Sequence, residues 1–322
     1  MVLGTARLDA QTCCSGGVPL ASNLGLPAAE RGTWQVGLQY DYNRLTRLYA
    51  GSDRFREADR QRVTHTAILN AGYALGERWQ AELQLPYVGQ RRNILNTGNG
   101  RSRTRGIGDA VVLLRHRVLG HGAFAPWQWS VGLGTKLPTG AADRRNDDDI
   151  TLNADLQPGS GAWDLILWQR LSHQLRARPS VTVYVQAVHR RRGVNDAYLP
   201  VTDPLSGDRR FQTYQFGRET QVQGGIADRI AVGGRTWEPG LSLIYRHAGA
   251  DRTNDVVTPS TGGDFLFGQF TLALLYSPRT RVRAAFDLPL LNNVTGTQLA
   301  PTYRANVGIF LTLAPQNTSS EP

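Results

Sequence analysis

The stretch LNADLQPGSGAWDLILWQ (Leu152–Gln169) decides the fold, because its last residues alternate in polarity. Successive side chains of an extended strand point to opposite faces. Trp163, Leu165 and Leu167 therefore share one face, while Asp164 and the following Arg170 lie on the other. A soluble sheet would bury the apolar face against a core, whereas a membrane β-barrel turns it outward to lipid and keeps the polar face inside.

The same period of two recurs along the chain, and no segment shows a convincing amphipathic helix. Apolar and polar residues alternate in about twelve runs, which predict strands near residues 33–42, 62–75, 78–87, 107–118, 127–138, 162–172, 180–190, 211–227, 236–247, 265–277, 280–290 and 303–313. Tryptophan and tyrosine residues stand near the ends of several runs, where the aromatic girdles of membrane proteins lie. This placement favours the membrane barrel over a soluble sandwich or jelly roll.

The connections between these runs alternate in length. Longer polar stretches at 46–61, 91–106, 139–161, 191–210, 248–264 and 291–300 are separated by shorter ones at 76–78, 119–126, 173–179, 229–235 and 277–280. Outer-membrane barrels have short periplasmic turns and longer extracellular loops. The pattern predicts an all-β protein, a single antiparallel up-and-down transmembrane β-barrel of about 12 strands, in the outer membrane with both termini periplasmic.

Composition divides the chain into three segments and argues against one class of partner. The barrel is expected over 33–314, preceded by a periplasmic segment at 1–32 with a remnant of a signal peptide and followed by a polar tail at 315–322. The net charge is +10, and Lys136 is the only lysine among the 36 basic residues. These charges are spread along the chain, which argues against nucleic acid as a partner. The adjacent Cys13 and Cys14 suggest a disulfide or redox pair rather than a metal site.

The chain carries no enzyme signature. It has no phosphate-binding loop, no zinc-protease motif and no nucleophile elbow, and its six histidines are scattered without ligand spacing. The acidic run at 143–151 lacks the glycine and terminal glutamate of a calcium-binding loop. We therefore expect neither catalysis nor a cofactor or metal.

Three stretches carry a resemblance to a known family. IGDAVVLLRHRV (Ile107–Val118), GLGTKLPTG (Gly132–Gly140) and LQPGSGAWDLIL (Leu156–Leu167) resemble, in this order, the phenol-degradation MetA-pathway family of bacterial outer-membrane barrels. The family is described as transporters or porins, and the resemblance extends over roughly residues 33–314. It implies the fold and the membrane more firmly than a substrate. Small organic solutes, with carboxylated aromatics among them, would suit both the family and the positive charge.

Charged residues on the inward face are the functional candidates, because rings of charged side chains set the ionic preference of a pore. By strand parity the path for solute comprises Asp109, Arg115, Arg117, Lys136, Asp164, Arg170, Arg281, Arg283, Asp287 and Arg304, and Arg190, Glu219 and Arg246 follow by the same rule. We expect a channel for small anionic or aromatic organic solutes by passive diffusion, with membrane lipid and lipopolysaccharide as neighbours. Two alternatives remain: a sealed structural barrel that binds an envelope partner, and an outer-membrane enzyme.

Overall fold

The computed structural model describes residues 31–56, 60–94, 100–120, 125–146, 149–202 and 209–313. No helix within these ranges is long and apolar enough to span a membrane. Cys13 and Cys14, the polar tail and nearly all of the 1–32 segment lie outside the described residues, so the predictions made for them stay predictions.

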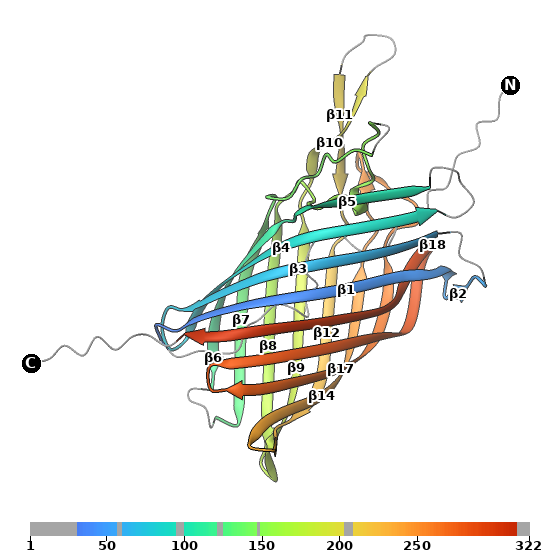
Figure 1. Cartoon of the computed structure of the whole chain (residues 1–322). Helices are drawn as coiled ribbons and strands as arrows, with labels where there is room; N and C mark the ends of the chain where they lie inside the picture. Colours follow the sequence, from blue (N-terminus) through green and yellow to red (C-terminus); the bar gives the residue numbers. More distant parts are fainter. Residues whose placement is uncertain are drawn as a thin grey trace, which may run out of the picture.

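Antiparallel strands close into a ring (Figure 1). The ring runs in the order β1 (Trp34–Gly51), β3 (Arg60–Ala74), β4 (Trp79–Ile94), β6 (Ala110–Leu119), β7 (Trp127–Leu137), β8 (Asp164–Leu175), β9 (Arg178–Arg192), β12 (Glu219–Asp228), β14 (Arg235–Ala248), β17 (Gly263–Ser277) and β18 (Thr280–Leu313), which pairs again with β1. All of its pairings are antiparallel, and the closure leaves no edge strand in the ring.

The last strand supplies two adjacent passes across the wall. Residues 280–294 of β18 pair with β17, and residues 297–313 pair with β1. The backbone N–H of Thr312 donates to the carbonyl oxygen of Arg279 at 2.8 Å, which joins the two arms. Gly296, with a φ of 71°, allows the tight turn between them. The eleven labelled strands of the ring thus make twelve passes, in line with the prediction of about twelve.

Several predicted connections are instead extensions of the sheet. β5 (Arg101–Ile107) pairs with the end of β4, so most of residues 91–106 is strand. Beyond the ring, a second sheet contains β10 (Asn195–Thr202), β11 (Arg209–Gln215), β15 (Arg252–Thr253) and β16 (Val256–Val257), while β2 (Asp53–Arg54) and β13 (Ile230–Val232) extend two hairpins. The apolar alternation ends where the barrel wall ends, but backbone hydrogen bonding continues past it.

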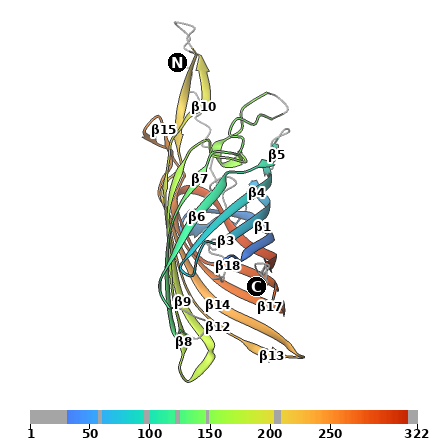
Figure 2. The same ribbon diagram turned by 90° about the vertical axis from the view of Figure 1, so that its left-hand side faces the viewer.

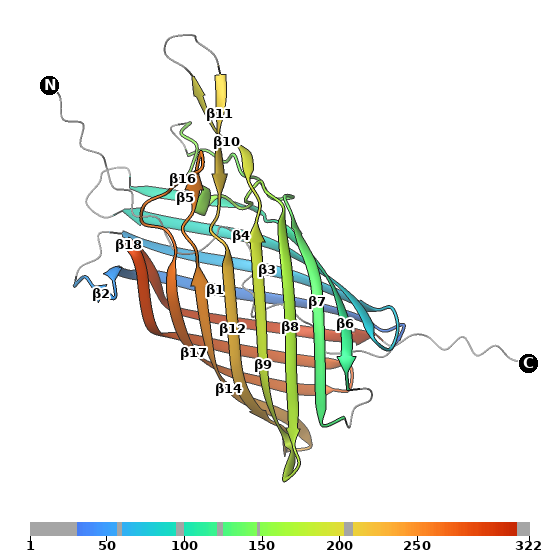
Figure 3. The same ribbon diagram turned by 180° about the vertical axis from the view of Figure 1, so that it is seen from behind.

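The two walls of the ring run in different directions. β1, β3, β4, β17 and β18 cross the near side in Figure 1, and β6 to β9 and β12 cover the far side seen in Figure 3. Trp34 at the start of β1 pairs with Leu313 at the end of β18, so the chain enters and leaves the barrel at the same end. The turns 75–78, 176–177 and 278–279 lie at that end, which is called the short-turn end below.

The apolar faces of the strands point outward. Leu165 and Leu167 are 46% and 48% exposed, whereas the neighbouring Asp164 is 4% exposed. The interior is mainly polar, and its buried side chains on the first strands include Gln35, Gln39, Asp41, Gln80, Glu82 and Gln84. A soluble sandwich would show the opposite arrangement, with the apolar faces buried together.

Because the apolar faces point outward, an arginine added to the outer face of β8 should destabilise the protein more than one added to its inner face. Leu167→Arg places a guanidinium on the apolar outer face, and we expect a loss of roughly 2–4 kcal/mol in the free energy of unfolding in lipid vesicles. Ser172→Arg on β8 places the same group in the polar interior and should cost less than half as much. Urea titration followed by gel mobility measures both values, and equal losses would contradict the assignment of faces.

Candidate functional site

The three stretches that carry the family resemblance meet at one buried side chain. The ammonium group of Lys136, at the end of β7, donates to Asp109 Oδ2 at 2.8 Å, to the carbonyl oxygen of Ala162 at 2.7 Å, and to the hydroxyl of Ser160. Asp164 Oδ2 lies 3.6 Å from the same nitrogen. Both Lys136 and Asp109 are fully buried. All three ammonium protons therefore have an acceptor, as a buried charge requires.

Asp109 fastens both ends of the long segment between β7 and β8. Its Oδ1 accepts from the backbone N–H of Gly140 at 3.0 Å, and its Oδ2 accepts from the N–H of Ser160 at 2.8 Å. The backbones touch here, because a Cβ on Gly159 would stand 2.4 Å from the oxygen of Gly140 and 2.6 Å from the Asp109 carboxylate. Only glycine fits at such an approach, which explains the glycines of both motifs.

A chain of ion pairs continues from this point around the inner wall. Asp164 lies 3.4 Å from Arg192, and Arg192 lies 2.8 Å from Glu219, which also binds Arg246 at 3.2 Å. We call the series Asp109, Lys136, Asp164, Arg192, Glu219 and Arg246 the ion-pair belt. Its members come from neighbouring strands of the sheet and are at least nine-tenths buried. Charges in the belt largely neutralise one another.

Residues 152–160 form a bridge across the mouth of the barrel, at the end opposite the short turns. On one side the guanidinium of Arg62 on β3 pairs with Asp155 at 3.0 Å, with both side chains buried. Gln90 Nε2 on β4 donates to the oxygen of Gln157 at 3.2 Å, and the Thr104 hydroxyl on β5 donates to a carbonyl of the bridge. Figure 2 shows this segment, in green, gathered over the upper end of the ring.

The other side of the mouth bridge rests on the second sheet. The backbone N–H of Ala154 donates to the hydroxyl of Tyr198 at 2.9 Å, and Ala154, Tyr198, Tyr214 and Phe216 form a buried cluster. Burial raises the pKa of Tyr198 to about 12. Burial and the nearby Asp251 carboxylate also raise the pKa of Tyr214, so its hydroxyl stays protonated and donates to Asp251 at 2.6 Å. The bridge thus joins two separate parts of the rim.

Below the belt, toward the short-turn end, the interior opens into a cavity of about 300 Å³. Arginines and hydroxyls line it, and Trp168, Tyr184 and Phe310 contribute aromatic faces. Residues beside the turns, among them Pro126, Ser180 and Arg229, form part of the wall, which places the cavity at the end where the chain enters the barrel.

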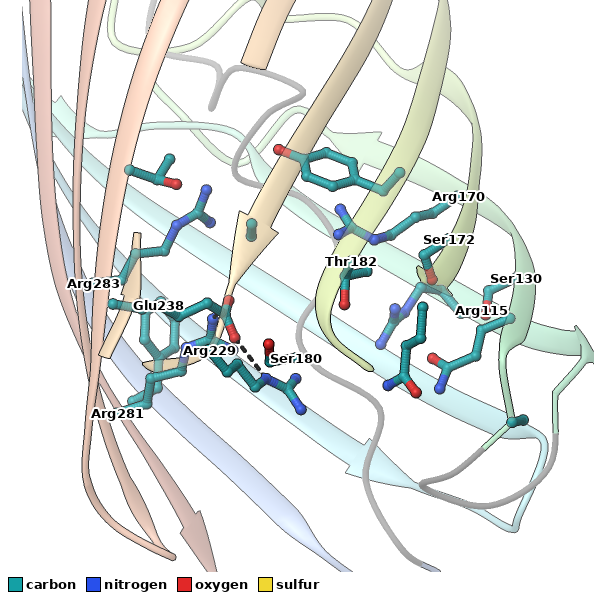
Figure 4. Close-up of a pocket in the computed structure, with 18 of the residues that line it drawn as sticks. Arg115, Ser130, Arg170, Ser172, Ser180, Thr182, Arg229, Glu238, Arg281 and Arg283 are labelled. Atoms are coloured by element: carbon teal, nitrogen blue, oxygen red, sulfur yellow. Dashed lines mark hydrogen bonds and ion pairs between the residues drawn. The ribbon is translucent and has the colours of Figure 1, made fainter. Parts of the chain in front are cut away.

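The arginines of the cavity differ in their partners (Figure 4). Glu238 binds both Arg281 at 2.6 Å and Arg229 at 2.9 Å, and Arg115 binds Glu82 at 2.6 Å. Among the described residues, no carboxylate lies within ion-pair distance of Arg170 or Arg283. Arg170 stacks on the ring of Tyr184 at 4.0 Å and bonds to Gln186 at 3.3 Å. Figure 4 shows Arg170 and Arg283 projecting into the cavity from different walls.

Nine of the ten predicted path residues fall into three places, and Arg117 lies apart from them. Arg115, Arg170, Arg281 and Arg283 line the cavity, while Asp109, Lys136 and Asp164 belong to the belt. Asp287 and Arg304 face inward. The Arg304 guanidinium lies 2.5 Å from the Asp41 carboxylate and 3.7 Å from the Asp287 carboxylate. Arg117 is half-buried and does not line the cavity. Whether any of them contacts a solute stays a prediction.

Sequence reasoning missed four partners that define this arrangement: Arg62, Asp155, Arg192 and Glu238. Parity along the strand at 62–75 could have identified Arg62 as inward-facing. Arg192 fell in a stretch expected to be a connection, and Asp155 lies on an inserted segment that has no strand parity. Glu238 lies within TWEPG, where proline and glycine interrupt the alternation. A contact map would have been needed for the last three.

Two histidine pairs resemble part of a catalytic triad, which bears on the enzyme alternative, but neither forms a complete triad. His189 Nδ1 lies 2.9 Å from the Thr220 hydroxyl, and His247 Nδ1 lies 2.8 Å from Asp264. The Tyr245 hydroxyl also donates to Asp264 Oδ1 at 2.7 Å. Among the described residues, however, no hydroxyl is hydrogen-bonded to His247 and no carboxylate to His189, as a triad requires. The same part of the chain contains no cluster of three or more histidine, cysteine, aspartate or glutamate residues able to hold a metal.

No protein-family model matches the chain, and no curated protein matches its sequence. Solved structures do resemble it. An outer membrane channel from Pseudomonas putida F1 is 16% identical with a TM-score of 0.63, over 92% of this chain and 100% of that one. The β domain of the Bordetella autotransporter BrkA is 12% identical with a TM-score of 0.51, over 88% and 100%. The chain has the fold of an outer-membrane β-barrel. At these identities the likeness concerns the fold alone, and the resemblance to the MetA-pathway family stays a prediction.

The fastening role of Lys136 predicts a strong effect of its removal. Lys136→Met leaves the Asp109 carboxylate buried without a cation and leaves Asp164 with Arg192 alone, and we expect a loss of about 3–5 kcal/mol in unfolding free energy. Trypsin should then cut the segment between β7 and β8 after Arg144 or Arg145 at a much lower concentration. Lys136→Met with Asp109→Asn should recover part of the stability, since one uncompensated charge is gone. An unchanged protease pattern would contradict the fastening role.

Proposed function

We propose that the protein is an outer-membrane channel for small anionic organic solutes, with carboxylated aromatic molecules as the best fit. The observation that carries this proposal is the cavity in which Arg170 and Arg283 lack a carboxylate partner among the described residues. The fold shared with an outer membrane channel supports the location. Both chain ends of the barrel lie at the short-turn end, which supports periplasmic termini.

The chemistry of the cavity suits a carboxylate on an aromatic ring. A guanidinium binds a carboxylate through two parallel N–H donors, and Arg170 and Arg283 offer two such groups. Phe310 offers a flat apolar face for a ring, while the rings of Tyr184 and Trp168 already carry Arg170 and Arg115 on one face. The cavity volume of about 300 Å³ is at the small end of ligand pockets, which favours small molecules.

The mouth bridge and the ion-pair belt must also be part of the mechanism. The bridge crosses the end opposite the cavity, and in our proposal residues 152–160 move when a solute passes. The belt holds the two ends of the inserted segment through Asp109 and Lys136. We propose that the belt anchors the base of this segment while the bridge above it opens and closes the path.

The same two features favour the second candidate, a sealed structural barrel. A belt of neutralised ion pairs and a bridge across the mouth would suit a barrel that passes nothing and serves an envelope partner. The two candidates differ in conductance across a planar bilayer. A wild-type protein that conducts ions supports the channel, and one that never conducts under any voltage supports the sealed barrel.

Selectivity tests the role of Arg170 and Arg283, the two cavity arginines that lack a carboxylate partner in the described part of the chain. The wild type should prefer anions in a salt gradient, and Arg170→Gln with Arg283→Gln should shift the reversal potential toward zero, because two uncompensated positive charges leave the cavity. The control Arg235→Gln with Arg279→Gln removes the same charge from exposed positions and should shift it far less. A cation-selective wild type would rule out the arginine-lined path.

Conductance also tests the mouth bridge as a gate. Arg62→Ala with Asp155→Ala removes a buried pair without leaving either charge alone, and it should raise the open fraction about tenfold, which corresponds to about 1.4 kcal/mol. The control Arg178→Ala with Asp228→Ala removes a more exposed pair at the short-turn end and should leave the open fraction unchanged. Equal behaviour of the two variants would contradict gating by the bridge.

A further inference from the structure

A group of arginines lies on the outer surface of the barrel, on β4 and β5. Arg101, Arg103 and Arg105 alternate with the inward-facing Ser102 and Thr104, so all three side chains share the outward face of β5. Arg91 on β4 points the same way and is the direct cross-strand partner of Arg103. We call Arg91, Arg101, Arg103 and Arg105 the outer arginine patch.

The patch is unfavourable by itself. Like charges placed directly opposite each other in an antiparallel pair destabilise the sheet, and Arg91 faces Arg103. Each of the four side chains is exposed, and none has a carboxylate within ion-pair distance in the described part of the chain. Together with Asn93, Ser102, Thr104, Arg145 and Asn146, they line a hollow of about 680 Å³ at the rim of the barrel. Arg145 is already paired there with Asp149 at 2.8 Å. Such a group calls for an anion that is not part of the protein.

The position of the patch indicates where the anion comes from. Tyr87 and Ile107 are cross-strand partners on the same outward face, and they are 49% and 61% exposed. They belong to the apolar outer surface of the wall. Along β5, Arg105 lies two residues beyond Ile107 and Arg103 lies four residues beyond it, in the direction away from the short-turn end. These separations amount to about 7 and 14 Å along the strand.

These distances match the thickness of a lipid headgroup layer. A strand tilted by about 45° reduces them to roughly 5–10 Å in height above the apolar surface, and headgroup regions extend about 5–8 Å on each side of the hydrocarbon core. Arg105 therefore stands within the headgroup layer, and Arg103 with its partner Arg91 stands at the outer margin of that layer, at the end of the barrel opposite the chain termini.

We infer that the outer arginine patch binds the phosphate groups of lipid A, the phosphorylated anchor of lipopolysaccharide in the outer leaflet. The planar guanidinium groups of Arg91 and Arg103 offer paired donors to a phosphate. Tyr87 and Ile107 would contact the acyl chains below. The inference rests on the proposed outer-membrane location but not on the solute path, since these side chains point away from the lumen.

Native mass spectrometry of the full-length protein in detergent tests the site. The protein is titrated with diphosphoryl lipid A and with lipid A lacking both phosphates. The wild type should bind the phosphorylated form at least about tenfold more tightly. Arg91→Ser with Arg103→Ser should abolish this preference. The control Arg235→Ser with Arg279→Ser, which removes two exposed arginines at the short-turn end, should retain it.

Four outcomes would overturn the inference: no preference for the phosphorylated lipid in the wild type, equal losses in the two variants, equal binding of phosphatidylglycerol, or displacement of lipid A by inorganic pyrophosphate at an equal concentration. The third would indicate general attraction to anionic lipid, and the last a site for free phosphates. The reversal potential of Arg91→Ser with Arg103→Ser should equal that of the wild type. A failure of the lipid site is thereby distinguished from a failure of the proposed channel.

Discussion

The buried contact between Lys136 and Asp109 is the interaction on which the rest of the lumen depends. It joins the start of β6, the end of β7 and the last residues before β8 at one point. A buried ammonium without acceptors, or the buried Asp109 carboxylate without its cation, would destabilise this packing strongly. Because every proton of the ammonium has an acceptor, the inserted segment has a defined base from which it can reach across the mouth.

This contact divides the interior into two regions of different character. The six charges of the belt lie within a few ångströms of one another and sum to zero, and the buried Arg190 opposite Glu219 adds one positive charge to that region. Below it, Arg170 and Arg283 have no carboxylate partner among the described residues, and their charge remains available to a ligand. The cationic character expected of the whole lumen is therefore concentrated at one end, and the proposal of an anion path rests on a few side chains.

The wall of the barrel is organised by the same alternation on both of its surfaces. Outward positions are apolar along the middle of the strands and become arginine on β4 and β5 beyond the apolar surface. Inward positions are mainly polar, and they include the buried apolar cluster of Val111, Leu113, Ile166, Trp168 and Val188. One face of a strand can thus contact the lipid and its headgroups, while the other face lines the lumen. A shift of register by one residue would exchange the two roles, which is why the pairing is strongly specified.

The sequence by itself determined the elements and the facing of their side chains. A period of two needs only local information, so Leu165 and Leu167 were assigned outward and Asp164 inward, and about twelve strands were expected. The alternation also indicated the antiparallel order, since hairpin neighbours are adjacent in the chain.

Only the tertiary structure decided which charges meet. Asp155 and Arg62 are 93 positions apart in the chain, and the local alternation of side chains cannot predict a contact between residues so far apart. The inserted segment between β7 and β8 follows no strand parity, so its course over the mouth depends on contacts with β3, β4, β5 and the second sheet. Whether an inward arginine is neutralised or free depends on strands closing into a ring, which brings Glu238 to Arg281 and leaves Arg170 and Arg283 facing the cavity.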